Sequence, residues 1–248
     1  MYLRCLSLAL VLAAAPLAAK ELRVCAEPDN LPYSRTDESG FENRIARLLA
    51  QDLNATLVYA WLPQRRAFVR RSEGRCEVFI GVPSDFERLM TTKPYYRSSY
   101  VFVWKKTPLR SFDEPHLRDL RIGVQLPGND LAATPPGHAL ALRGATDNVV
   151  GYTIYGERPA AERIVAAIAR GELDAAVIWG PQAGYFADGL QLAAAQAPAE
   201  LASLPFAFSI SVGVRRGHRA LRDEIDAALE RRRRDIDAVL GEYRVPRL

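Results

Sequence analysis

Polar, charged and aromatic side chains gather where the predicted strands of this chain end. Because the carboxyl ends of parallel strands meet at one edge of an open α/β sheet, such residues share a ligand-binding crevice. Aromatic walls with a few charged groups suit a small molecule. The sequence therefore predicts a ligand- or partner-binding cleft. Its candidate residues are Glu27, Asn30, Tyr33, Trp61, Gln64, Arg65, Arg66, Ser84, Asp85, Tyr95, Tyr96, Arg97, Gln125 and Trp179.

The adjacent pair Arg65 and Arg66 follows Pro63 at a predicted helix start. Two guanidinium groups there could hold a carboxylate or phosphate through paired hydrogen bonds. A hydrated pair that forms surface salt bridges is an equally good interpretation, and the sequence leaves both open.

Recognisable catalytic motifs are missing from the sequence. It contains no glycine-rich phosphate loop and no nucleophile elbow. Its three histidines, His116, His138 and His218, fall in loops or at helix starts and are not spaced as metal-ligand partners. We therefore expect a protein that is not an enzyme and that carries no metal or cofactor.

The stretch from Cys76 to Lys105 organises the chain. An apolar strand at 78–82 ends at a proline, and a charged turn then leads into a second β-rich run at 100–104. Alternating strands and helices on both sides of this stretch predict a parallel sheet built by crossovers. The other predicted strands are 21–26, 56–61, 121–125, 149–154, 174–179 and 204–215, and the helices are 41–53, 63–74, 113–120, 138–143, 159–171, 181–187 and 219–243.

Composition and the N-terminal pattern indicate an exported globular protein. A length of 248 residues suits one large or two small domains, and 49% hydrophobic residues allow a sizeable core. Residues 1–19 combine Arg4, a short apolar run and a small-residue end, which is the pattern of a cleavable signal peptide. No other segment has the ~18 apolar residues of a membrane helix. The net charge of +4 is too mild to indicate nucleic-acid binding, and the run 231–234 (RRRR) favours a solvated helix face over a phosphate-binding arm.

Several segments carry a resemblance to a known family. They are 41–43 (FEN), 63–66 (PQRR), 91–98 (TTKPYYRS), 147–152 (DNVVGY) and 179–181 (WGP). The organising stretch resembles the crossover of type II periplasmic solute-binding proteins. At closer range the chain resembles the MxaJ/XoxJ group, which are solute-binding-like proteins associated with pyrroloquinoline-quinone (PQQ) alcohol dehydrogenases. The resemblance covers nearly the whole chain after the leader.

This resemblance implies an α/β, two-lobe periplasmic binding protein type II fold with two crossover strands and a cleft between the lobes. Lobe 1 would begin with residues 20–104, lobe 2 would take 105–205, and a return crossover with C-terminal helices at 206–248 would complete lobe 1. It also implies a periplasmic protein. The implied partner is a PQQ-dependent methanol or alcohol dehydrogenase, or its c-type cytochrome.

Two cysteines, Cys25 and Cys76, remain after the leader. An even pair in an oxidising compartment indicates a disulfide first. In the fold that the chain resembles, the two strands concerned are neighbours, so the link is feasible. Two unlinked buried thiols are the alternative.

The chain departs from the amino-acid-binding members of this fold at both of their charge clamps. Asp85 falls near the position of the arginine that would hold a ligand's α-carboxylate. The Trp179-Gly180-Pro181 turn replaces the acidic residue that would receive the amino group, and Asn30 replaces a stacking aromatic residue. Buried ligand charges without partners are costly, so we expect no tight binding of common amino acids.

Three classes of function compete at this point. The first is an accessory or partner-binding protein of a quinoprotein dehydrogenase, which the family resemblance favours. The second is a transport binding protein for an unknown small molecule. The third is an enzyme on this scaffold, such as a dehydratase that uses a cleft carboxylate like Glu27. A neighbouring apolar surface patch would support the first, and a cleft carboxyl with a raised pKa would support the third.

Overall fold

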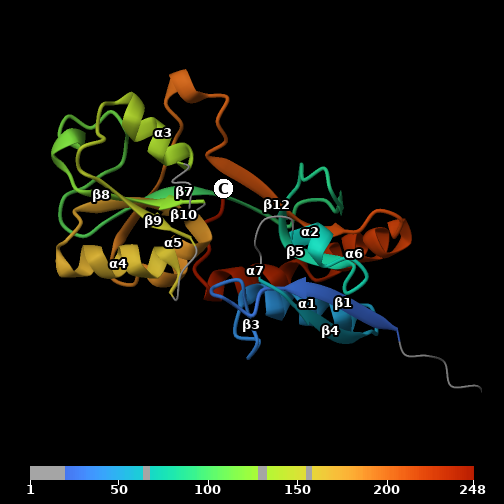
Figure 1. Cartoon of the computed structure of the whole chain (residues 1–248). Helices are drawn as coiled ribbons and strands as arrows, with labels where there is room; N and C mark the ends of the chain where they lie inside the picture. The colour runs from blue at the N-terminus through green and yellow to red at the C-terminus, as the bar shows by residue number, and fades with distance from the viewer. Residues whose placement is uncertain (1–19, 64–67, 128–132, 155–157) are drawn as a thin grey trace, which may run out of the picture.

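A computed structural model of the whole chain describes residues 20–63, 68–127, 133–154 and 158–248. Two lobes lie side by side, with the strands β7 (Tyr96–Trp104) and β12 (Ala207–Val214) running between them (Figure 1). The arrangement is the α/β, two-lobe type II periplasmic binding protein fold predicted from the sequence. The predicted signal peptide, 1–19, lies outside the described residues.

Lobe 1 is built on the strand order β4-β1-β5-β12, with β6 added to β12. Strand β1 is parallel to both β4 and β5, as expected of β-α-β crossovers. Its core contains the apolar faces of three helices, α1, α6 and α7. The elements are β1 (Glu21–Ala26), β2 (Asp29–Asn30), β3 (Ser34–Arg35), α1 (Phe41–Asp52), β4 (Thr56–Trp61), α2 (Phe68–Arg71), β5 (Val78–Pro83), β6 (Met90–Thr91), α6 (Arg219–Arg231) and α7 (Arg233–Glu242).

Lobe 2 repeats the same construction with the strand order β7-β10-β8-β9, and β11 also pairs with β7. Strand β8 is parallel to β9 and β10, and helix α4 packs its apolar side on the sheet. The elements are η1 (Leu117–Asp119), β8 (Ile122–Leu126), α3 (Pro135–Leu142), β9 (Val149–Thr153), α4 (Ala160–Arg170), β10 (Ala175–Trp179), α5 (Gly180–Phe186), β11 (Gln191–Ala194) and η2 (Ala199–Leu201).

Both long strands change sheets partway along their length. In β7, residues from Tyr96 to Ser99 pair with β12, and residues from Tyr100 onward pair with β10 and β11. In β12, the first half pairs with β7 and the second half with β5 and β6. These are the two crossover strands, and they bring side chains from one sheet directly beside the other.

The predicted disulfide is present. Cys25 on β1 is bonded to Cys76, just before β5, with a Cα–Cα distance of 5.4 Å. Both cysteines are buried, in a small cluster with Phe79 and Leu89. The bond therefore ties neighbouring segments of lobe 1 together beneath α2.

The predicted continuous helix at 219–243 is wrong, because the structure has two helices that meet at Arg232. Six residues lie between the buried Leu229 and the next buried apolar residue, Ile236. After the break at Arg232, the apolar residues of α7 also pack into the core of lobe 1. In the run 231–234, Arg231 and Arg232 form ion pairs with Asp52, and Arg233 pairs with Glu230. That pattern fits a solvated helix face.

Smaller differences concern element ends. Strand β7 begins at Tyr96 rather than at 100, because its first residues find a partner in β12. The short edge strand β11 was not predicted. Helix α2 covers Phe68–Arg71, and the start of the helix predicted at 63–74 lies outside the described residues.

Candidate functional site

A cavity of about 290 Å³ lies where the lobes meet the two crossover strands. Its volume is close to the lower end of small-molecule sites. Lobe 1, the crossover strands and lobe 2 all contribute to its wall. The described lining residues are Asn30, Tyr33, Glu42, Ile80, Gly81, Pro83, Tyr96, Tyr100, Trp179, Phe208 and Ile210.

Among the described lining residues, Glu42 is the one with a carboxyl group. It lies in the first turn of α1, and the residue is only 8% exposed. Its backbone N–H donates to the carbonyl of Tyr33, at 2.9 Å, so the helix start is joined to the loop that carries another lining residue. An acidic residue is favoured in this first turn by the helix dipole.

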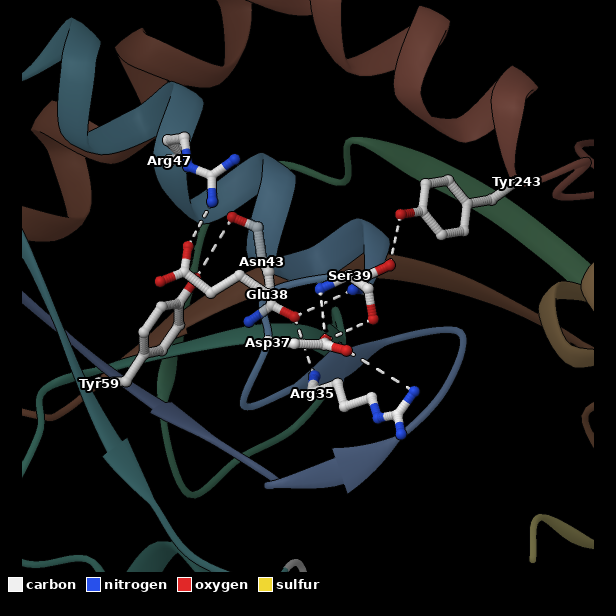
Figure 2. Close-up of polar contacts among 9 residues, drawn as sticks. Arg35, Asp37, Glu38, Ser39, Asn43, Arg47, Tyr59 and Tyr243 are labelled. Carbon is white, nitrogen blue, oxygen red and sulfur yellow. Dashed lines mark hydrogen bonds and ion pairs between the residues drawn. The ribbon is translucent and has the colours of Figure 1, made fainter.

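A network of polar contacts fixes the start of α1, the helix that carries Glu42 (Figure 2). Asn43 Oδ1 accepts hydrogen bonds from the backbone N–H groups of Arg35, at 2.9 Å, and Gly40, at 3.2 Å. Asp37 accepts from the backbone N–H of Ser39, and Tyr243, the residue directly after α7, donates its hydroxyl to the Ser39 carbonyl. These bonds satisfy backbone groups that a helix start would otherwise leave unpaired. The loop before α1 is thereby positioned from both the sheet side and the α7 side.

Gly81 makes room for the Glu42 carboxyl group. It lies within β5 with φ of +76°, a conformation that favours glycine. A Cβ atom added there would lie 1.9 Å from Glu42 Oε1. The strand backbone therefore forms the surface against which the carboxyl group rests.

Burial, together with a smaller contribution from the nearby Glu27 carboxylate, raises the pKa of Glu42 to about 8. The carboxyl group is therefore mostly protonated at neutral pH. Burial also raises the pKa of Tyr33 and Tyr96 well above the usual value, and the pKa of Tyr100 to about 12. The tyrosines around the cavity thus stay neutral hydroxyl groups.

Aromatic rings from three elements complete the wall. Trp179, at the end of β10, packs edge-on against Tyr100 of β7 and Phe208 of β12, each with a centroid distance of 5.5 Å. Such T-shaped contacts are favourable ring geometries. They join lobe 2 to both crossover strands at the cavity.

Gln125 fixes the backbone of Trp179 through a hydrogen bond. Its Oε1 accepts the backbone N–H of Trp179 at 2.9 Å, and its Nε2 donates to Gln182 at 2.6 Å. Gln125 itself is 4% exposed and lies on β8, the strand next to β10. Its observed role is to position the tryptophan, and it is not among the residues that line the cavity.

The structure brings together only part of the predicted cleft set. Asn30, Tyr33, Tyr96 and Trp179 line the cavity. Glu27 is near enough for its charge to act on Glu42. Gln64, Arg65 and Arg66 lie outside the described residues.

Other predicted residues have different surroundings. Ser84 bonds to the Ser209 carbonyl and the Ser211 hydroxyl, which joins β5 to β12. Tyr95 is buried and also borders a groove beside α6. Trp61 stacks on Tyr59 with a centroid distance of 4.5 Å. Asp85 and Arg97 are exposed.

Prediction from strand ends missed Glu42, Gly81, Tyr100 and Phe208. Glu42 follows a loop and starts a helix, so a search of strand ends passes over it. A glycine inside an apolar strand is itself a signal of close approach, and Gly81 carried that signal. Tyr100 and Phe208 reach the cavity because they lie on strands that change sheets.

Within the described parts of the chain, no group of three or more His, Cys, Asp or Glu side chains could hold a metal ion. The same residues include no helix long and apolar enough to cross a membrane.

Comparison with known proteins places the chain beside one group. Protein MoxJ of Methylorubrum extorquens is 32% identical over 254 aligned residues, which cover 92% of this chain and 82% of that protein. The crystal structure of the periplasmic binding protein XoxJ from Methylobacterium extorquens AM1 is 33% identical, with a TM-score of 0.76 over 92% of this chain and 99% of that one. The crystal structure of MxaJ from Methlophaga aminisulfidivorans MPT is 26% identical, with a TM-score of 0.76 over 92% and 100%. A scan against protein-family models found no match.

Proposed function

Because the chain belongs to the MoxJ family, we propose that it is a non-catalytic periplasmic accessory protein of a PQQ-dependent methanol or alcohol dehydrogenase system. The observation that supports this most is similarity over 82% of MoxJ from Methylorubrum extorquens and 99% of XoxJ, both lobes included. In this role it binds or activates the dehydrogenase or its c-type cytochrome.

The cleft supplies the contact surface in this proposal. A two-lobe cleft can hold a protruding loop of the partner, and aromatic and arginine side chains are enriched in interface hot spots. Arg97 is exposed on β7, and Trp61 is half-buried at the end of β4. Together with Arg65 and Arg66 they form the proposed contact set. Tyr96 and Trp179 lie deeper, in the cavity wall, where a partner side chain would reach them last.

The test is binding to the dehydrogenase and the cytochrome of the same organism by biolayer interferometry. The double variant Arg65→Ala/Arg66→Ala and the variant Arg97→Ala should weaken the complex and leave the melting temperature almost unchanged. Arg170→Ala is the matched control, because Arg170 is an exposed arginine on α4. If neither partner binds at tens of micromolar, and deletion of the gene leaves alcohol oxidation intact, the proposal fails.

The cavity favours a second candidate, a substrate-binding protein for a small molecule. Its volume and aromatic wall suit such a ligand. A cleft carboxyl group with a raised pKa is also expected of an enzyme, and Glu42 has one. The other described titratable lining groups are tyrosines whose pKa values are raised, so they are poor proton acceptors at neutral pH. We therefore favour binding over catalysis.

A further inference from the structure

The wall of the cavity is rich in aromatic rings. Tyr33, Tyr96, Tyr100, Trp179 and Phe208 all line it, from both lobes and both crossover strands. Their mutual T-shaped contacts, such as Trp179 with Phe208, fix the rings in place. A cation held against the faces of fixed aromatic rings is attracted by their quadrupoles, and quaternary ammonium groups are recognised in this way.

Glu42 is the described lining residue that can give this wall a negative charge. More than nine-tenths of the side chain is buried, and it lines the cavity. Among the described residues, none forms a hydrogen bond with its carboxyl group, and none of the lining residues is a lysine or an arginine. An ionised carboxylate would have no counter-ion among the described residues, so Glu42 stays protonated in the empty cavity and a positive ligand supplies the missing counter-charge.

We propose that this cavity binds a small organic ammonium ion, with the Glu42 carboxylate as its counter-ion and the aromatic wall around its alkyl groups. Trp179 and Tyr100 provide cation–π contacts, and Gly81 leaves the carboxyl group room to face the ligand. The inference does not depend on the dehydrogenase partner, because it concerns a ligand inside the cavity.

Other ligand classes fit less well. A zwitterionic amino acid also brings a carboxylate, for which the described wall offers no cationic partner. A metal ion needs more acidic or histidine ligands than the described residues gather anywhere. A neutral alcohol fits the volume but brings no charge that would favour the ionised form of Glu42.

Binding of such a cation should release a proton. The titratable groups whose charges couple to Glu42 are Glu27, Tyr33, Tyr59, Tyr95 and Tyr96, all acidic or neutral. Burial and the Glu27 charge favour the protonated form of Glu42 in the empty cavity, and the tyrosines stay neutral. A cation favours the ionised form, so its affinity should rise as pH rises to about 8.

Isothermal titration calorimetry with choline tests the proposal, and 3,3-dimethyl-1-butanol is the matched neutral probe of the same shape. Methylammonium and tetramethylammonium extend the series. We expect choline or one of these cations to bind, the neutral probe to bind at least about tenfold more weakly, and free lysine not to bind. The cation should bind more than about tenfold tighter at pH 8 than at pH 6. Titrations near pH 7 in phosphate and in Tris should report release of a proton.

Glu42→Gln keeps the shape of the side chain and removes its charge. It should weaken cation binding at least about tenfold and abolish the pH dependence. Glu21→Gln, at an exposed glutamate on β1, is the matched control and should bind as the unchanged protein does. The proposal is overturned if none of the three cations binds at about 10 mM. Equal binding of choline and its neutral analogue by the unchanged protein overturns it as well, without relying on any variant.

Discussion

The two lobes share one construction but contribute unequally to the cavity. Among the described residues, lobe 1 supplies Asn30, Tyr33, Glu42, Ile80, Gly81 and Pro83, whereas lobe 2 supplies Trp179. The corresponding strands also end differently. Strand β5 opens a space with Gly81, and β10 closes it with an aromatic ring. Ligand chemistry is thus concentrated in lobe 1, while lobe 2 adds a ring that depends on the lobes being together.

The lobes are held together on another side by the C-terminal segment. After α7, Arg244 pairs with Asp188 and donates to the carbonyl of Tyr185, and both partners belong to lobe 2. Ser98 on β7 donates to the carbonyl of Pro246 at 2.6 Å. The chain end therefore links lobe 1, a crossover strand and lobe 2. These contacts help to hold lobe 2, and with it Trp179, in position beside lobe 1.

The largest expected effect is a pH dependence of the stability that comes from Glu42 of lobe 1. Glu42 has a raised pKa of about 8 in the folded protein, against a usual value of 4.5. From about 4.5 to about 8 the unfolded chain has lost this proton and the folded protein still holds it. Stability should therefore fall as pH rises through this window, by roughly 1.4 kcal/mol per pH unit from this group, and level off above it.

The measurement is urea unfolding of the unchanged protein and of Glu42→Gln across this pH range. The difference between them isolates Glu42, because all other groups titrate in both. We expect Glu42→Gln to gain relative stability with rising pH, by a few kcal/mol in total. A difference that stays constant with pH would show that Glu42 ionises normally.

The disulfide gives lobe 1 a covalent tie. The double variant Cys25→Ala/Cys76→Ala should lose about 2–4 kcal/mol of stability, because the unfolded chain regains the freedom of a long loop. Hydrogen exchange should show the loss in β1 and β5, with smaller changes in β8 and β10. Thiol titration of the unfolded, unreduced protein should detect no free cysteine in the mature chain. Equal losses of protection in both lobes would contradict this assignment to lobe 1.

A pair of glycines gives a matched test of the space beside Glu42. Gly81 in lobe 1 and Gly171 in lobe 2 have φ values of +76° and +77°. A Cβ at Gly171 would meet nothing within 4 Å, whereas one at Gly81 would meet Glu42. Alanine at either position should cost roughly 1 kcal/mol or more for the backbone conformation.

The excess cost of Gly81→Ala over Gly171→Ala should be about 1–2 kcal/mol, from displacement of the Glu42 side chain. Thermal unfolding of both variants measures it. The excess should shrink in the Glu42→Ala background, where the obstacle is gone. Equal costs in the original background would mean that the carboxyl group moves aside freely.

The sequence predicted the framework better than the site, for identifiable reasons. The strands β1 and β4 were predicted to the residue, at 21–26 and at 56–61, and the two cysteines left after the leader predicted the disulfide. The break at Arg232 was missed because helix-forming residues continue through it. The cavity wall depends on strands that change sheets, which pattern alone does not locate. Glu42 was missed because it starts a helix, outside the strand ends that were searched.

The smallest effect concerns the lobe 2 contribution. In Gln125→Leu the backbone N–H of Trp179 loses its acceptor while the core volume is kept, which should cost about 1–3 kcal/mol. The loss should be local to β8 and β10 by hydrogen exchange, and Trp179 should become more mobile. Gln191→Leu, at an exposed glutamine on β11, is the control and should change little. Because Glu42 and the network of polar contacts at the start of α1 lie in lobe 1, the pH dependence of stability should survive in Gln125→Leu. If the pH dependence disappears in Gln125→Leu, the raised pKa of Glu42 depends on both lobes. The conclusion that lobe 1 alone sets the chemistry of the cavity is then wrong.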